Sequence, residues 1–298
     1  MPFSHIGELA ALGTAFCWTI TSMAFESASK KVGSLAVNLI RLMMALVLLT
    51  LFCWIVRGRP LPDDASAHAW LWLSVSGLVG FTIGDLCLFR AFVVVGARIS
   101  MLLMTMVPPF TALLGWVLLG ETLNPMDWMG MAFIVGGVAW VVLERRPVGE
   151  MKTERPSRSG ILLGIAGAAG QSLGLVLSKL GMGSYDPFAA TQIRVIAGIV
   201  GFSVLFLFIG WWPRVFSALK NRGAMARISL GAVFGPFLGV SLSLVAVQHT
   251  EAGVAATLMG LTPIIIIPPA IWINKERISP RAIIGAFVAV GGAALLFL

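Results

Sequence analysis

Charged side chains are scarce in this sequence. Only 11% of its 298 residues are Asp, Glu, Lys or Arg, whereas 58% are hydrophobic, and the mean hydropathy is +0.94. Soluble domains carry about 25% charged residues, so this chain cannot cover a water-facing surface. Apolar runs of roughly 20 residues, the length that spans a bilayer, recur along the chain and leave no room for a separate soluble domain. The composition predicts an all-α integral membrane protein.

Residues that bind metals or catalyse reactions are also sparse. The three cysteines, Cys17, Cys53 and Cys87, lie inside apolar runs, at spacings that suit neither a metal site nor a disulfide framework. The histidines are scattered in loops, which argues against a membrane-embedded enzyme. No P-loop is present, and the glycines within 164–170 follow no strand. We therefore expect no enzyme, no cofactor and no direct use of ATP.

The positive charges outnumber the negative ones, giving a net charge of +8 and a pI near 10.1. They lie in short loops without a continuous basic face, which favours attraction to an anionic leaflet over binding to nucleic acid. No basic segment precedes the first apolar run, so we expect that run to be retained as a helix.

Charged or Pro/Gly-rich breaks divide the apolar runs into ten predicted transmembrane helices. The first repeat, 7–143, has spans at Gly7–Ala28, Ser34–Val56, Trp70–Val94, Ala97–Leu119 and Trp128–Leu143. The second repeat, 160–298, has spans at Gly160–Leu180, Pro187–Gly210, Ala226–Val247, Gly253–Ile273 and Ala282–Leu298. A charged linker, 144–159, joins the two repeats.

The two halves match each other in register. Shifts of 153 and 155 residues align residues that chance similarity between apolar segments would not, namely Arg41 with Arg194, Pro108 with Pro263, Glu121 with Glu276 and Gly136–Gly137 with Gly291–Gly292. Because each half has an odd number of spans, the second half is inverted relative to the first. Inverted five-helix repeats around a central cavity are typical of transporters that work by alternating access.

Lys and Arg predict the orientation of the chain. Most of them fall in the linker and in the loops after odd-numbered spans, whereas the other loops hold only Arg57, Arg59 and Lys179. Positive loops face the cytoplasm. We therefore expect both termini outside and the linker inside.

Further motifs occur at fixed places in the repeat. An Arg lies early in the second helix of each half, within Asn38–Arg41 and Gln192–Arg194. The third helix carries Gly84-Asp85-Leu86 followed by Arg90-Ala91, and the fourth has a mid-span proline and ends in Leu119-Gly120-Glu121. In these features the sequence resembles the EamA family of the drug/metabolite transporter superfamily, over nearly the whole chain.

The resemblance implies ten helices around a cavity and transport of metabolites, often amino acids. The weaker second copy keeps Pro263 and Glu276 but has Val240 at the position of Asp85. We expect a secondary transporter, most simply an exporter of amino acids or related compounds across a bacterial inner (plasma) membrane. A multidrug or toxic-compound efflux pump is the alternative. Partners are the small solute, the bilayer and possible coupling protons, in a monomer or homodimer.

Ionisable residues inside the spans are candidates for gating or coupling. Such a residue at a helix centre in lipid costs about 2.5–3.5 kcal/mol, so it should face a cavity or a partner. Asp85 is the best example. Arg90 follows it on the same helix at about 140°, so Arg41 is the better partner. Their pair is either a gate, a proton-sensitive pair or a fixed structural contact.

Arg41 and Arg194 occupy equivalent positions, and we expect inversion to bring them near opposite membrane faces. There they either snorkel to headgroups or attract anionic and zwitterionic solutes. The first helices of the two repeats carry corresponding stripes on one face. Trp18, Ser22, Gln171 and Leu175 are substrate-binding candidates that line the cavity, and Glu26 and Lys179 are charges for gating, with packing and interfacial anchoring as the alternatives.

Prolines interrupt the fourth helix of each repeat. Pro108 cannot bond to the Met104 carbonyl, nor Pro263 to the Met259 carbonyl. Freed carbonyls at membrane depth must face protein or a wet cavity. We therefore predict that Met104, Thr105 and Met259 contact substrate, with a kink satisfied by a neighbouring helix as the alternative.

Overall fold

The computed structural model describes residues 5–119, 125–142, 157–249, 255, 258–273, 275 and 278–295. These residues form helices and no strand. Six helical stretches among them are long and apolar enough to cross a membrane, and shorter apolar helices accompany them. The all-α membrane architecture expected from composition is therefore confirmed. Most of the linker, together with Glu121 and Glu276, lies outside the described residues.

The first half is a chain of helices with very short connections. It comprises α1 (Ile6–Val32), α2 (Ser34–Arg57), α3 (Ala67–Gly77), the π-helical turn η1 (Leu78–Gly84), α4 (Asp85–Leu103), the 3₁₀ turn η2 (Met104–Met106), α5 (Val107–Leu119) and α6 (Pro125–Val142). Gly33 and Gly96, with φ of 86° and 83°, turn the chain within one residue, a conformation that favours glycine. Gly96 divides α4 at the boundary predicted between the third and fourth spans.

The second half follows the same plan. It comprises α7 (Arg158–Met182), α8 (Pro187–Ile209), α9 (Trp212–Leu219), α10 (Arg222–Ala232), the π-helical turn η3 (Val233–Gly239), α11 (Val240–His249), α13 (Thr262–Ile265), α14 (Ile267–Trp272) and α15 (Pro280–Leu295). Its π-helical turn starts 155 residues after that of the first half, the same shift that aligns the sequences. The short helix α9 was not predicted, because a Trp-Pro start and flanking charges read as a loop.

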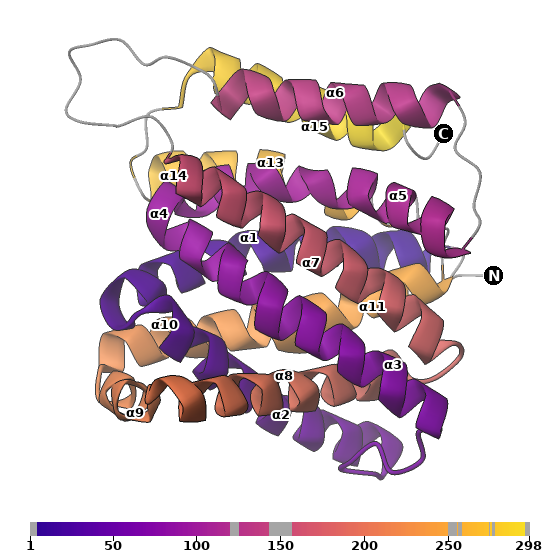
Figure 1. The fold of residues 1–298 in the computed structure, drawn as a ribbon, viewed down its shortest axis with the longest axis vertical. Helices are drawn as coiled ribbons and strands as arrows, with labels where there is room; N and C mark the ends of the chain where they lie inside the picture. The colour runs from indigo at the N-terminus through magenta and orange to yellow at the C-terminus, as the bar shows by residue number, and fades with distance from the viewer. Residues whose placement is uncertain are drawn as a thin grey trace.

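The two halves run in opposite directions through the molecule. In Figure 1, α1 starts at the side where α15 ends, whereas α7 starts at the opposite side, where α6 ends. The halves also interlock, because α1 packs on α10, η3 and α11, and α7 packs on α3, η1 and α4. Each first helix thus lies against the third span of the other half.

Two pairs of equivalent helices enclose the crossed helices. The second helices, α2 and α8, pack together at one end, and the fifth, α6 and α15, form a separate layer at the other (Figure 1). Glycines make the second contact close: the backbone of α15 would lie within 2.7 Å of a Cβ on Gly137. The space between these pairs contains the cavity described below.

Apolar side chains cover much of the outer surface. Ile55, Phe208 and Trp272 are 82%, 87% and 79% exposed. A water-soluble protein rarely exposes contiguous apolar surface on this scale, whereas lipid solvates it without cost. The buried core includes a cluster of aromatic rings around Phe25, Phe81 and Phe89.

Candidate solute cavity

A cavity of about 150 Å³ lies between the two halves. One water needs ~10–15 Å³ on this measure, so the space can hold a small organic solute. Both halves contribute walls: α1, α2, η1, α4, η2 and α5 from the first, and α7, α8, η3, α11, α13 and the residues just before α13 from the second. Ten residues that the sequence pointed to line it: Trp18, Ser22, Arg41, Asp85, Met104, Thr105, Gln171, Leu175, Arg194 and Met259.

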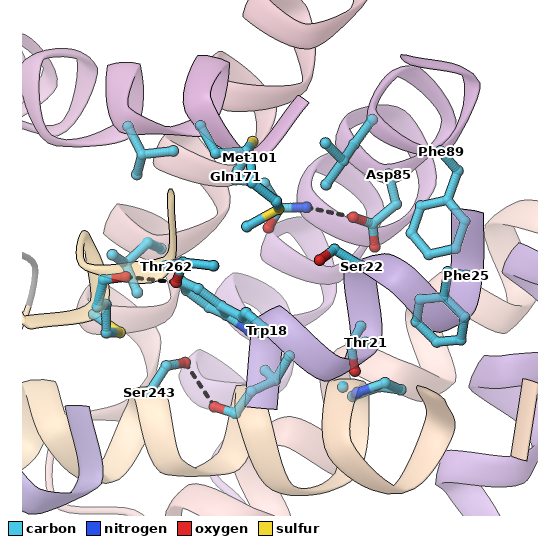
Figure 2. Close-up of a pocket in the computed structure, with 18 of the residues that line it drawn as sticks. Trp18, Thr21, Ser22, Phe25, Asp85, Phe89, Met101, Gln171, Ser243 and Thr262 are labelled. Atoms are coloured by element: carbon cyan, nitrogen blue, oxygen red, sulfur yellow. Dashed lines mark hydrogen bonds between the residues drawn. The ribbon is translucent and has the colours of Figure 1, made fainter. Parts of the chain in front are cut away.

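A buried ion pair lies at one side of the cavity. Arg41 and Asp85 are each 4% exposed, and an Arg41 Nη donates to an Asp85 carboxylate oxygen. The Gln171 amide donates to the other oxygen at 2.6 Å, as Figure 2 shows. Asn38 accepts from Arg41 Nε at 3.1 Å and donates to the Asp85 carbonyl at 3.3 Å. The expected partner of Asp85 is therefore present, and both of its carboxylate oxygens are occupied.

Arg194 is placed differently from Arg41. It is 4% exposed and lines the same cavity, and its guanidinium lies 4.8 Å from the centre of the Phe81 ring. The Arg41 guanidinium is 5.7 Å from the same ring. The expectation of two arginines near opposite membrane faces was wrong. Eight residues of helix rise only about 12 Å, which brings each side chain close to the middle of a core of ~30 Å.

Arg194 has no neutralising contact within the described part of the chain. Its buried Nε–H donates to no acceptor there, and none of the ion pairs among those residues includes Arg194. Asp85 attracts it electrostatically, but Arg41 and Gln171 already occupy that carboxylate. The two arginines are equivalent in the sequence repeat, but their surroundings in the structure differ.

Aromatic rings form much of the remaining wall. Phe25 and Phe89 lie 4.9 Å apart between ring centres, and Figure 2 shows them side by side near Asp85. Phe81 and Phe92 also line the cavity. Sequence reasoning missed these residues, because phenylalanine in an apolar helix suits lipid and cavity equally.

The π-helical turns bring wall residues into place in both halves. Such turns widen a helix by one residue and are frequent at functional sites. Turn η1 carries Phe81 and ends directly before Asp85, and Gln171 donates to the Gly80 carbonyl in it at 3.3 Å. Turn η3 carries Pro236, which lines the cavity from the opposite half.

Both proline breaks are satisfied locally. The Met104 carbonyl accepts from the N–H of Val107, the residue directly after η2, and the Met259 carbonyl accepts from the Thr262 hydroxyl at 2.8 Å. Neither a neighbouring helix nor a substrate is needed to pair them. Met104, Thr105 and Met259 nevertheless line the cavity, so their contribution to a site is through side chains.

Three predicted gating residues do not reach the cavity. Arg90 and Lys179 are exposed and do not line the cavity, because each lies on a face of its helix that points away from the wall. Glu26 is buried but pairs with Lys30, one turn further along α1, at 2.5 Å. Both residues belong to α1, so breaking this contact would not release one helix from another, as a gate requires.

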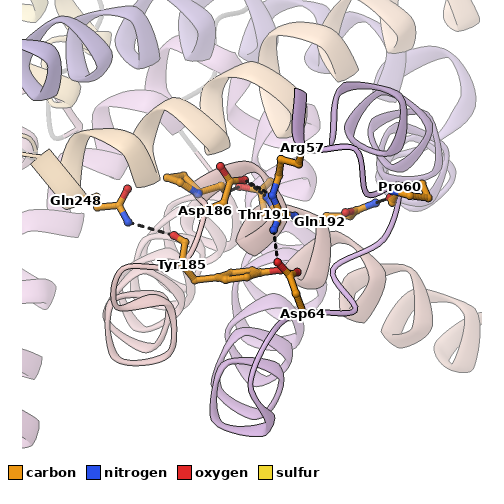
Figure 3. A network of polar contacts seen from close by, with 10 residues as sticks. Arg57, Pro60, Asp64, Tyr185, Asp186, Thr191, Gln192 and Gln248 are labelled. Atoms are coloured by element: carbon orange, nitrogen blue, oxygen red, sulfur yellow. Dashed lines mark hydrogen bonds and ion pairs between the residues drawn. The ribbon is translucent and has the colours of Figure 1, made fainter. Parts of the chain in front are cut away.

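A second polar network joins both halves (Figure 3), at the end of the molecule where Figure 1 marks the chain termini. Arg57, at the end of α2, donates to Asp64 at 2.7 Å and lies 3.9 Å from Asp186. The Tyr185 hydroxyl also donates to Asp64 at 2.7 Å. The Gln248 amide, at the end of α11, donates to the Tyr185 carbonyl at 3.1 Å. Sequence analysis did not find this network, because its members are far apart in the chain: the two loop residues Asp64 and Tyr185 alone are separated by 121 positions.

These contacts shift the protonation of the two loop residues. The Tyr185 hydroxyl and then Arg57 stabilise the carboxylate, which lowers the pKa of Asp64. Partial burial and the neighbouring Asp64 raise the pKa of Tyr185 to about 12. Asp64 is therefore ionised and Tyr185 neutral across the physiological range, as their hydrogen bond requires.

Comparisons with known proteins agree with this architecture. The chain is 28% identical over 139 residues to Protein LicB of Haemophilus influenzae, in a match that spans 46% of each chain. It is 30% identical over 128 residues to an uncharacterized transporter in the cobO 3′ region of a Sinorhizobium species, covering 40% of this chain and 90% of that one. The chain thus matches about half of the length of LicB.

One solved crystal structure has the same fold, with a TM-score of 0.67 over 97% of this chain and 95% of the other, at 17% identity. A family model described as the EamA-like transporter family matches twice, at residues 5–143 and 158–298. The two matches coincide with the two halves of the structure and leave out the linker. The chain belongs to the EamA-like transporter family.

Proposed function

We propose that this membrane transporter moves small amphiphilic metabolites, most simply amino acids or related compounds, by alternating access and in the direction of export. Family membership makes it a transporter of small molecules. The proposal adds the solute class, the direction, ten membrane crossings and a bacterial inner membrane with the linker in the cytoplasm.

One observation carries the mechanism. The cavity lies where two oppositely directed halves interlock, and its walls include equivalent elements of both halves: η1 corresponds to η3, and α1 corresponds to α7. Two packings related by such a repeat have similar energies, so the bundle can open the same cavity to either side in turn. The apolar and aromatic lining beside a few charges suits a solute with an apolar tail and a polar head.

Closure requires a contact that can break at one end. We assign this role to the Arg57–Asp64–Tyr185–Asp186 network. It joins the end of α2 and the loop that follows it to the loop directly before α8. Polar contacts at an exposed end exchange readily with water, whereas the buried Arg41–Asp85 pair does not. The network is then the outer gate and Arg41–Asp85 a fixed part of the cavity wall, unless coupling protons act on Asp85.

Counterflow in proteoliposomes tests the proposal. Purified protein is loaded with an unlabelled solute and exposed to trace labelled solute, using a panel of amino acids and a panel of cationic drugs at two pH values. We expect counterflow of amino acids. Counterflow of drugs alone would support an efflux pump, and none with either panel would contradict the proposal. If Asp85→Asn leaves a pH-dependent rate unchanged, Asp85 does not couple protons.

A further inference from the structure

The charged groups of the cavity do not balance. Among the described residues that line it, three are charged: Arg41, Asp85 and Arg194. Arg41 and Asp85 neutralise each other through direct contact. Arg194 is left as a cation, 4% exposed, with a buried Nε that has no partner in the described residues.

An uncompensated buried cation is unfavourable in itself. A charge moved out of water needs a partner and hydrogen bonds, and ionisable residues within membrane-spanning helices mark substrate or ion pathways. A neutral residue in place of Arg194 would change only this cavity, because the guanidinium lies beside the Phe81 ring and the backbone near Gly80. Its unpaired state is therefore a property of the empty cavity.

We propose that Arg194 binds a single carboxylate on the transported solute. The guanidinium fork matches a carboxylate with two parallel hydrogen bonds, and one negative charge neutralises the cavity, whereas a phosphate dianion overcompensates it. The rings of Phe25, Phe81 and Phe92 and the side chains of Met104 and Met259 then surround the apolar tail. This inference rests on the proposed transport function and distinguishes Arg194, which binds solute, from Arg41, which holds Asp85.

Binding in detergent, where passive diffusion plays no part, tests the carboxylate directly. The probes are two matched pairs, L-leucine with L-leucinamide and 4-methylpentanoate with 4-methylpentanamide, together with sodium phosphate and chloride. Affinity is measured by calorimetry and by the shift of the unfolding temperature. We expect each acid to bind about 10- to 100-fold more tightly than its amide, the range for a hydrogen-bonded charge.

The variants separate recognition from folding. Arg194→Gln should remove the preference for the acid while leaving the unfolding temperature without ligand unchanged or higher, because an unpaired buried charge is lost. Arg194→Lys should restore part of the preference, and the control Arg227→Gln, at a half-buried site that does not line the cavity, should keep all of it. If Arg194→Gln does not fold, Arg194→Lys provides the test instead, because it keeps the positive charge and must still bind the acid more tightly than the amide.

The outcomes distinguish this inference from the transport proposal. Equal binding of acids and amides, stronger binding of phosphate or chloride, or an acid preference that survives in Arg194→Gln overturns the role of Arg194. Amino-acid counterflow that is equally inhibited by acids and amides overturns it too, while the transport function stands. Acid binding through Arg194 without any counterflow contradicts the transport function and leaves the binding site in place.

Discussion

At the scale of single residues, the Arg41–Asp85 pair is the contact whose loss has the largest expected effect. Removing one partner of a buried ion pair leaves the other charge uncompensated and costs about 3–5 kcal/mol. We expect that loss for Arg41→Gln, because Asp85 then keeps only the Gln171 amide. Denaturant unfolding in micelles measures it.

A double-mutant cycle checks the reason for that loss. In Arg41→Gln/Asp85→Asn both charges are gone, so the double variant should be clearly more stable than the sum of the two single losses predicts. Strictly additive losses would show that the two side chains do not act as a pair.

The Arg57–Asp64–Tyr185–Asp186 network makes a prediction about pH. The pKa of Asp64 is lowered, so its contribution to stability is present above the unfolded value of about 3.9 and disappears as the pH falls through the lower folded value. The pKa of Tyr185 is raised to about 12, so its contribution is present below about 10 and disappears as the pH rises towards 12.

Between about pH 5 and 9 the network should therefore be insensitive to pH. The difference in unfolding temperature between the parent chain and Tyr185→Phe should stay constant over this range and shrink in stronger acid. A difference that changes near neutrality would mean that another titrating group controls the network.

At the scale of helices, two neighbouring glycines of α6 provide a matched pair. A Cβ on Gly137 would lie 2.7 Å from the Ala289 nitrogen in α15, whereas one on Gly136 meets nothing within 4 Å. Gly137→Ala should destabilise by about 1–3 kcal/mol through overpacking. Gly136→Ala should be neutral or stabilise by up to about 1 kcal/mol through helix propensity.

Unfolding measurements on both variants, and on the equivalent pair Gly291→Ala and Gly292→Ala in α15, test this packing. A Cβ on Gly292 would lie 2.7 Å from the Gly130 carbonyl oxygen, and one on Gly291 would meet nothing within 4 Å. Equal effects within either pair would contradict the observed contact between α6 and α15.

The helices were readable from the sequence to different degrees. Long apolar runs gave the spans and the break at Gly96, because lipid requires continuous apolar length. The Arg41–Asp85 contact followed from the need to pair a carboxylate in lipid. Helix α9 could not be predicted, because the sequence of a short amphipathic helix resembles that of a charged loop. The π-helical turns also have no residue signature, apart from glycines that read as packing sites.

At the scale of the whole molecule, inversion predicts the sidedness of the loops. In a variant without native cysteines, Asp63→Cys should react with a membrane-impermeant maleimide only from outside, since Asp63 is 68% exposed in the loop after α2. Lys220→Cys, at the exposed end of α9, should react only from the cytoplasm. Labelling of both from one side would contradict the assigned topology.

The cavity was only partly predictable at this scale. Polar residues on apolar helices, such as Gln171 and Ser22, identify themselves because lipid excludes them. The aromatic wall needs the packing of both halves, which no single helix encodes. Whether a phenylalanine faces lipid or solute depends on which helix of the other half covers it.

The exchange of first helices between the halves has a consequence for biosynthesis. Glycines of α7 fit against the third span of the first half, where Gly170 would bring a Cβ within 2.7 Å of Gly84. A ribosome delivers that span long before α7, so the groove it leaves must be filled by lipid or a membrane chaperone in the meantime. Nascent chains that end before α7 should therefore be the ones that quality-control proteases of the membrane recognise.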